Sequence, residues 1–527
     1  MTEEKDVMGA AEGLAYGAMH LFWGNTLSTV ILAVCAIAVG RLLGPANYGL
    51  YSLAIFVPTF LLGFIDFGIT SAIMRFSAKF RAEGKDSDAR KIVWTGILFE
   101  LALGITLSLF CFALSYPISS FLINRPTASF YIRVMSFLIL FLTFNNVLET
   151  AFIGLDRTKF TSLMMIVQAI AKIALSLSLI LIGLSVLGAL LGQLLSYVIV
   201  VPVGLASLSL IVFKGHDDFG WSSDSLKTML KYGMPLYLGG LASMFLGQYQ
   251  TLVLAHFVNN TEIGNFQVAV LFESSTALIG YPFITLFPAF SKLKVESGQV
   301  SRFFRRSVKY VSVLLLPVIV AIAILSKDLI YTLFGSAYVL APTFLTFYVL
   351  IDLYCGFGST VFSYLFMGIG RTDVALKVNL IGLLVFLPLA PLLTFLFGVL
   401  GLILSLFIIN FCQLLYFLAM TQKYVKTGPD FRTSAKAFAA TALSAVPLIA
   451  FLRASPFSSI PNLILGAIII LIAYLTLLPI LGVLNQEDME IFKQLFRKIR
   501  AVRVIVKLFI SYETKILGYK QKLRNQN

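Results

Sequence analysis

Charge is scarce in this chain of 527 residues. Only 12% of the residues are Asp, Glu, Lys or Arg, whereas 59% belong to the hydrophobic set. A chain of this length could not bury so much apolar surface in soluble cores. The shortage of charge therefore excludes a string of soluble domains, and it indicates an integral membrane protein.

Residue types that serve metal or disulfide chemistry are also few. The three histidines have no metal-ligand spacing, and no glycine-rich phosphate loop ending in Lys-Ser or Lys-Thr occurs. We therefore expect no catalytic residues, no metal, no ATP hydrolysis and no cofactor beyond coupling to Na⁺ or H⁺. All four cysteines fall inside apolar stretches, which argues against a disulfide framework: Cys35, Cys111, Cys355 and Cys412.

Long apolar runs recur along the chain with short polar breaks between them. Each run must be helical, because hydrocarbon offers the backbone no outside hydrogen-bond partner. The pattern predicts an all-α integral membrane protein with about 14 transmembrane helices. The predicted spans are 20–41, 48–74, 92–115, 131–153, 159–183, 185–213, 229–256, 264–290, 308–326, 342–367, 374–397, 399–420, 436–453 and 460–484.

Lys and Arg are concentrated in alternate breaks, near 75–91, 157–159, 214–231, 292–309, 371–377 and 423–436. The intervening breaks carry only Arg41, Arg125, Arg133, Lys327 and Arg453. The positive-inside rule places the first set, and both termini, in the cytoplasm of a multi-pass cell-membrane protein. The net charge of +15 is then a consequence of membrane topology, and we expect no nucleic-acid partner.

The two ends of the chain differ in character. The acidic start, Met1–Asp6, lacks the basic flank of a signal peptide, so we expect the first apolar stretch to be retained. After Leu484, apolar residues from Ile491 to Phe509 recur every three or four positions among Lys and Arg. This pattern predicts an amphipathic helix on anionic lipids of the inner leaflet, with a solvated basic tail as the alternative.

The chain resembles itself. Three short stretches recur in the same order, and their offset shrinks by a single position from each pair to the next: Tyr48–Ala54 with Ile263–Ala269, Gly154–Thr158 with Gly368–Thr372, and Val186–Gly188 with Val399–Gly401. Six helices therefore repeat as six helices. An even number keeps both copies in one orientation, which predicts a pseudo-twofold axis along the membrane normal, as in transporters with parallel repeats.

The repeat predicts the domain organisation. We expect an N-lobe of six helices at 1–213 and a C-lobe of six helices at 214–425. Two further helices at 426–484 and the basic cytoplasmic tail at 485–527 lie outside the repeat.

Several stretches resemble the Wzx-type polysaccharide flippases of the multidrug/oligosaccharidyl-lipid/polysaccharide exporter superfamily. The most specific is Gly40–Pro45, continuing to Tyr48–Tyr51. The shorter ones are Gly154–Phe160, Lys231–Pro235, Leu286–Ser291, Gly335 with Tyr338, and Gln486–Asp488. The resemblance implies a fold of two six-helix lobes, often with two added helices. It also implies a substrate, polyprenyl-(pyro)phosphate-linked oligosaccharide moved from the cytoplasmic to the outer leaflet.

Ionisable residues inside a membrane are costly, so each is a candidate functional residue. Lys172 is the one basic residue well inside a span, and Gln168 lies four positions before it on the same helical face. On the fourth span, Asn145 and Glu149 share a face. We take these four residues as candidates for binding substrate, with Lys172 holding the pyrophosphate. The alternative is a structural ion pair between Lys172 and Glu149 or Glu100.

The remaining intramembrane carboxylates are candidates for ion coupling: Asp66, Glu100, Glu273 and Asp352. Their excess over lysine favours linked protonation or sodium binding. Arg41 is added to the substrate-binding set on the assumption that it faces the cavity, although an arginine at the outer end of a span is more often an interfacial anchor.

These features predict a secondary transporter, not an enzyme: a flippase for lipid-linked oligosaccharide that works by alternating access, in the synthesis of surface polysaccharide or glycoconjugate. The alternative on the same fold is a cation-coupled exporter of small amphipathic compounds, which the carboxylates favour. A membrane-embedded sugar polymerase or ligase would need a sizeable outside loop, and none is predicted.

Overall fold

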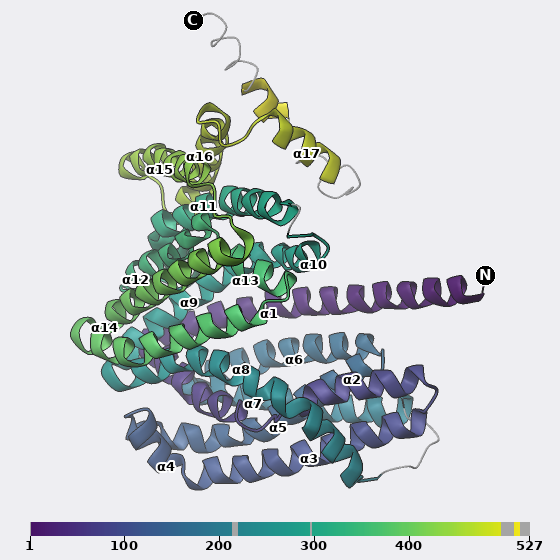
Figure 1. Cartoon of the computed structure of the whole chain (residues 1–527). Helices are drawn as coiled ribbons and strands as arrows, with labels where there is room; N and C mark the ends of the chain where they lie inside the picture. The colour runs from purple at the N-terminus through teal and green to yellow at the C-terminus, as the bar shows by residue number, and fades with distance from the viewer. Residues whose placement is uncertain (1, 213–219, 296–297, 497–510, 517–527) are drawn as a thin grey trace, which may run out of the picture. The chain divides into compact units, whose positions relative to one another are not determined.

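The computed structural model describes residues 2–212, 220–295, 298–496 and 511–516. Almost all of these residues are helical and none of them is in a strand, which confirms the all-α prediction. The chain divides into two compact units, Met1–Gln267 and Val268–Asn527, and the helices of both are labelled in Figure 1. This division follows compactness, so the lobe boundary at 213/214 that the repeat suggests stays a prediction.

The first unit holds the helices up to the start of α9. Short irregular turns, η1 to η4, join some of them. The elements are α1 (Thr2–Leu62), α2 (Ile69–Ala82), α3 (Asp86–Ala113), α4 (Ser115–Pro117), η1 (Ile118–Leu122), η2 (Pro126–Ala128), α5 (Ser129–Gly154), α6 (Thr158–Leu179), η3 (Ile180–Leu184), α7 (Ser185–Ala206), η4 (Ser207–Val212), α8 (Ser223–Phe257) and α9 (Asn260–Gly280).

The second unit holds the rest of α9 and the helices that follow. Its elements are η5 (Tyr281–Thr285), α10 (Leu286–Ser291), α11 (Gln299–Leu333), α12 (Ala341–Val349), η6 (Leu350–Phe357), α13 (Ser359–Gly368), α14 (Thr372–Val425), α15 (Phe431–Ala454), α16 (Ser459–Ile480) and α17 (Gln486–Phe496).

Within the described residues, eight helical segments are long and apolar enough to cross a membrane, or nine if the bent pair α12–η6/α13 counts as one span. Three of them have 44, 52 and 54 residues, whereas one crossing needs about 20. Each of the three contains a backbone break where the sequence predicts the end of one span and the start of the next: Gly44, Gly183 and Gly398. This arrangement is consistent with fourteen spans.

Many large apolar side chains on these helices face outward. Ile182, Leu181 and Phe395 are 76%, 73% and 72% exposed. Exposed apolar area on this scale is unfavourable in water, whereas a bilayer solvates it. Together with the eight spans, it makes the chain a multi-pass membrane protein.

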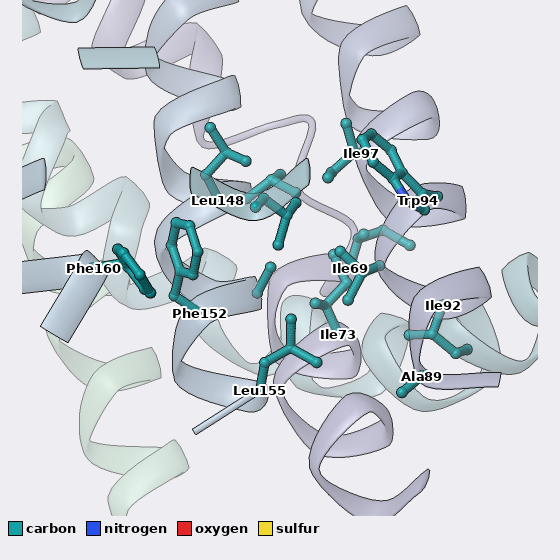
Figure 2. Packing of buried hydrophobic residues seen from close by; sticks show 14 of the residues in the cluster. Ile69, Ile73, Ala89, Ile92, Trp94, Ile97, Leu148, Phe152, Leu155 and Phe160 are labelled. Carbon is teal, nitrogen blue, oxygen red and sulfur yellow. The ribbon is translucent and has the colours of Figure 1, made fainter. Parts of the chain in front are cut away.

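The core of the first unit lies between α2, α3, α5, α6 and α7 (Figure 2). Ile69 and Ile73 of α2 and Trp94 of α3 belong to this core, and Phe152 and Phe160 lie 5.3 Å apart between ring centroids at the α5–α6 turn. Each of these five side chains is at least nine-tenths buried. The core therefore joins helices that are far apart in the sequence.

In the second unit, α15 and α16 pack against α11. Leu325, Leu448 and Ile470 form the centre of this contact, one from each helix. The two helices that the sequence places outside the repeat are thus attached to a helix of the second unit.

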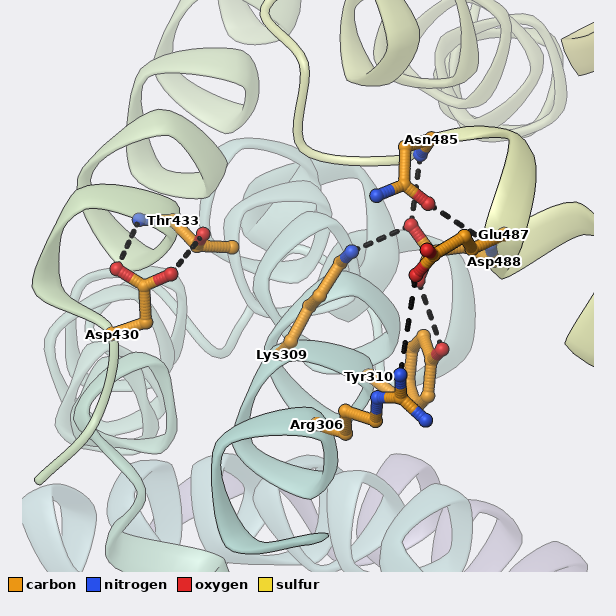
Figure 3. Close-up of polar contacts among 8 residues, drawn as sticks. All are labelled: Arg306, Lys309, Tyr310, Asp430, Thr433, Asn485, Glu487 and Asp488. Atoms are coloured by element: carbon orange, nitrogen blue, oxygen red, sulfur yellow. Dashed lines mark hydrogen bonds and ion pairs between the residues drawn. The ribbon is translucent and has the colours of Figure 1, made fainter. Parts of the chain in front are cut away.

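The buried carboxylate of Asp488 holds α17 to α11. Asp488 accepts hydrogen bonds from Lys309 at 2.6 Å and from the Tyr310 hydroxyl at 2.9 Å (Figure 3). Asn485 and Asp488 also cap each other's backbone N–H groups, at 2.8 and 3.0 Å, as in a capping box. The predicted amphipathic helix continues beyond Phe496 into 497–510, which lie outside the described residues.

The internal repeat is visible in the backbone of matching turns. Asp156 and Gly370 are the third residues of two matched stretches, and their φ angles are 55° and 76°. The N–H of Arg157 donates to Phe152 O at 2.7 Å, and the N–H of Arg371 donates to Phe366 O at 2.8 Å. Both turns therefore end one helix and begin the next with the same hydrogen-bond pattern, as the sequence match predicts.

A second pair of breaks also matches. Ser185 and Gly398 each directly precede a matched Val-Leu-Gly triplet. Ser185 has φ 47° and ψ −125°, and Gly398 has φ 59° and ψ −142°. These angles belong to a region that favours glycine. A non-glycine residue in that conformation, at the position the repeat predicts, shows that the fold imposes the break on both copies.

Candidate functional site

A cavity of about 380 Å³ lies in the first unit around the side chain of Lys172. Both halves of α1, together with α6, α7, α8 and the start of α9, contribute to its wall. The lining includes one cation, two primary amides and several hydroxyl groups. Its residues are Cys35, Ala36, Val39, Tyr48, Tyr51, Ser52, Ile55, Phe56, Thr59, Lys172, Gln193, Thr251 and Gln267.

Lys172 lines this cavity and has no carboxylate partner among the described residues. Its side chain is partly buried, and no Asp or Glu among the described residues forms an ion pair with it, the interacting titratable group being Cys35. The predicted alternative, a structural pair with Glu149 or Glu100, is therefore not formed in this structure. A lysine in this setting has three N–H donors available for an anion.

The carboxylates of the first unit line a different cavity, of about 430 Å³. Asp66, Glu100 and Glu149 contribute to its wall, and Thr59 belongs to both cavities. The second half of α1 contributes to both cavities. Its start, with Tyr48, lines the cavity that contains Lys172, and the turn after its end, with Asp66, lines the cavity that contains the carboxylates.

Local structure explains where these carboxylates point. Asp66 lies in the break between α1 and α2, next to Phe67 and Gly68 with φ angles of 44° and 77°, and its Oδ1 accepts the Thr70 N–H at 3.1 Å. Asn145 donates to Glu149 Oε1 at 2.9 Å. Glu100 is 3% exposed, and its Oε1 has no partner among the described residues. No group of three or more metal-ligating side chains in the described ranges is arranged to hold a metal ion.

The remaining two carboxylates belong to the second unit. Glu273 of α9 and Asp352 of η6 lie close enough to interact electrostatically with each other and with Tyr348. Asp352 lies near the start of η6, and the helix axis turns by 50° at the end of η6, between Phe357 and Ser359. The structure therefore divides the four ion-coupling candidates into two pairs, one in each unit.

Four residues of the predicted substrate-binding set do not line the Lys172 cavity, and one of them, Glu149, lines the carboxylate cavity. Gln168 is buried and donates to Ser196 Oγ at 3.1 Å, which joins α6 to α7. Asn145 binds Glu149 instead. Arg41 is exposed, three residues before the break at Gly44. Helical spacing places Gln168 on the same face of α6 as Lys172, but α7 packs over Gln168 and keeps it out of the cavity.

A sequence profile of the polysaccharide biosynthesis protein family matches residues 38–341, which include every residue of the Lys172 cavity except Cys35 and Ala36. The chain belongs to this family. The match confirms the resemblance to a polysaccharide-biosynthesis family that the Gly40–Tyr51 stretch suggested.

A relative of known role agrees with this assignment. The succinoglycan biosynthesis transport protein ExoT of Rhizobium meliloti (strain 1021) is 22% identical over 305 residues. That match covers 58% of this chain and 59% of ExoT, so it spans less than two thirds of the relative.

Solved structures share the fold at low sequence identity. The lipid II flippase MurJ, in an inward closed conformation, is 16% identical with a TM-score of 0.69 and covers 88% of this chain and 98% of MurJ. An inward-facing multidrug resistance transporter of the MATE family, MOP superfamily, is 17% identical with a TM-score of 0.63 and covers 76% of this chain and 94% of that one.

The Lys172 cavity also contains residues that the sequence did not single out for binding. Tyr48 and Tyr51 appear in the sequence only as part of the family-like signature, whereas the structure stacks their rings at 5.8 Å in the cavity wall. No pattern in the sequence marks Thr251 or Gln267 as a binding residue, because they belong to α8 and α9, far along the chain from Lys172.

Proposed function

We propose that this transporter moves polyprenyl-linked oligosaccharide from the cytoplasmic to the outer leaflet of the cell membrane by alternating access. The observation that carries the proposal is Lys172, a cation in a cavity of hydroxyl and amide groups, without a carboxylate partner in the described residues. Such a cavity suits a phosphate joined to a sugar, because Lys supplies charge and the neutral polar groups supply hydrogen bonds. The lipid chain would stay in the bilayer.

The test is transport in liposomes that contain purified protein and a fluorescent lipid-linked oligosaccharide. We expect Lys172→Ala to abolish transport while the protein still inserts and folds. Lys172→Arg should retain part of the rate, because the charge survives but the geometry changes. Lys227→Ala, which removes an exposed lysine of α8, is the matched control and should transport normally. Full transport by Lys172→Ala would refute the phosphate-binding role.

The carboxylate cavity supports two further parts of the proposal. Asp66, Glu100 and Glu149 would couple transport to Na⁺ or H⁺, with Glu273 and Asp352 as a second pair in the other unit. The same carboxylates also favour the alternative function, export of small amphipathic cations. A fluorescent cation offered to the same liposomes distinguishes the two, since a flippase should leave it outside and an exporter should move it.

The orientation and the tail belong to the same proposal. We infer from the basic loops that both termini are cytoplasmic, so that cysteines introduced at Lys85 and Arg305 should resist labelling from outside, unlike cysteines at Arg125 and Asn259. The basic residues after Leu484 would bind anionic lipids of the inner leaflet.

A further inference from the structure

The wall of the Lys172 cavity contains an amide oxygen that has no hydrogen-bond partner among the described residues. Gln193 of α7 is 8% exposed and lines the cavity, and its Oε1 makes no hydrogen bond to any described residue. The side chain also interacts with Tyr197, one turn further along α7. A buried acceptor left unpaired costs free energy, so its presence in a cavity wall calls for a ligand group that satisfies it.

The chemistry of that ligand group follows from the atom. An amide oxygen accepts hydrogen bonds and cannot donate them. An ionised phosphate is acceptor-only, so it suits Lys172 and cannot satisfy Gln193. A sugar hydroxyl can donate to Gln193 Oε1, and it can also accept from the amide of Gln267 or the hydroxyl of Thr251 in the same wall.

The size of the cavity limits how much of the substrate these groups contact. At about 380 Å³ it is near the lower end of the range for small-molecule sites, about 300–1,000 Å³. That volume suits one sugar and its phosphate more than a whole oligosaccharide. The neighbouring cavity is lined by Asp66, Glu100 and Glu149 and by no Lys or Arg, so Lys172 is the cation that these two cavities offer to a phosphate.

We propose that Gln193 is a specificity-determining residue that accepts a hydrogen bond from a hydroxyl of the sugar joined directly to the lipid phosphate held at Lys172. The inference rests on the proposed function and deepens it. It assigns recognition of the first sugar to Gln193 of α7, and it implies that this cavity does not contact the sugars farther from the phosphate.

The test compares soluble lipid analogues as ligands of the purified full chain. The probes are farnesyl diphosphate alone and farnesyl diphosphate joined to glucose, galactose or N-acetylglucosamine. Binding is measured by titration, with thermal stabilisation as a second readout. The variants are Gln193→Met, which is nearly the same size but apolar, and Lys172→Ala. Gln413→Met is the control, because Gln413 of α14 donates to Val378 O outside this cavity.

We expect wild type to bind at least one sugar-bearing probe about tenfold more tightly than farnesyl diphosphate alone. Gln193→Met should lose that tenfold difference and keep the binding of farnesyl diphosphate. Gln413→Met should behave as wild type. Lys172→Ala should lose binding of every probe.

The failures of the two proposals are distinguishable. If Gln193→Met keeps the sugar-dependent difference, or if no sugar probe exceeds farnesyl diphosphate in wild type, the role of Gln193 is refuted while the phosphate site stands. If Lys172→Ala binds every probe as wild type does, the phosphate site itself is refuted. A packing role for Gln193 predicts higher thermal stability in Gln193→Met with unchanged binding.

Discussion

Gly49 and Gly264 face each other where the second half of α1 crosses the start of α9. A Cβ at Gly49 would overlap the carbonyl oxygen of Asn260, and a Cβ at Gly264 would overlap that of Pro45. Pro45 and Asn260 each precede their glycine by four positions, so the two carbonyl groups also occupy matching places in the repeat. The contact is therefore reciprocal between repeat-related positions, as in an interface with local twofold symmetry.

This close approach makes both glycines intolerant of a side chain. We expect Gly49→Ala and Gly264→Ala each to destabilise the protein by about 1–3 kcal/mol, because the overlapping atoms are backbone and cannot move aside. Thermal unfolding of the detergent-purified protein measures the effect. Gly240→Ala of α8, where a Cβ meets open space, should leave stability unchanged or raise it, and equal stability of all three variants would contradict the crossing.

The matching breaks at Ser185 and Gly398 predict opposite responses to substitution. Ser185→Gly should stabilise the protein by up to about 1 kcal/mol, because glycine removes the backbone strain of a positive φ. Gly398→Ala should destabilise it by about 1–3 kcal/mol for the converse reason. Thermal unfolding again reports both, and destabilisation by Ser185→Gly would show that the hydroxyl does something the backbone geometry does not reveal.

Asp430 predicts a pH-dependent contribution to stability. The hydroxyl and the N–H of Thr433 donate to it at 2.6 and 3.3 Å (Figure 3), and the N–H of Arg432 donates at 3.2 Å. These hydrogen bonds hold the pKa of this carboxyl below its usual value. The pKa of an Asp side chain in the unfolded chain is about 3.9. Because the pKa of Asp430 is lower in the folded protein, its stabilisation is fully present above the unfolded pKa and is lost as the pH falls through the folded pKa.

Asp430→Ala should therefore cost about 1 kcal/mol at pH 7, the usual effect of removing a helix N-cap. The difference from wild type should shrink as the pH is lowered from 5 toward 3. Asp430→Asn keeps an acceptor oxygen and should retain most of the stability at pH 7 without the pH dependence. A difference that grows on acidification would contradict the sign of the argument.

The contact between Lys309 and Asp488 predicts release of α17. The two side chains are 17% and 7% exposed, so removing one leaves the other partly buried and unpaired. Asp488→Ala should cost about 2 kcal/mol, between the values for exposed and fully buried pairs, and should make the chain after Leu484 sensitive to protease. Glu487→Ala, whose carboxylate is exposed and 4.0 Å from Arg306, should change neither measurement.

A double substitution tests whether the effect comes from the pair itself. Lys309→Met combined with Asp488→Ala should cost less than the sum of the single changes, because neither partner then remains unpaired. Additive costs would mean that Tyr310 and the Asn485 cap hold α17 without the ion pair.

The sequence by itself determined the membrane character, the helical class and the repeat. Apolar runs and helical spacing are local properties that survive without knowledge of packing. The matched stretches align Asp156 with Gly370 and Ser185 with Gly398, and the two residues of each pair have similar positive φ angles. The breaks near Gly44 and Gly398 also follow from the sequence, because a helix longer than the bilayer must turn back.

Only the tertiary structure decided which intramembrane polar residues share a cavity. Gln168 and Lys172 lie one turn apart on α6, yet α7 covers Gln168 through Ser196 while Lys172 reaches toward α1. Likewise, the spacing of residues in the sequence does not show that Glu149 and Lys172 line different cavities, or that Gln193 and Gln267 line the same one. Those placements depend on how each helix is rotated about its axis, and the fit of side chains between helices distant in the sequence sets that rotation.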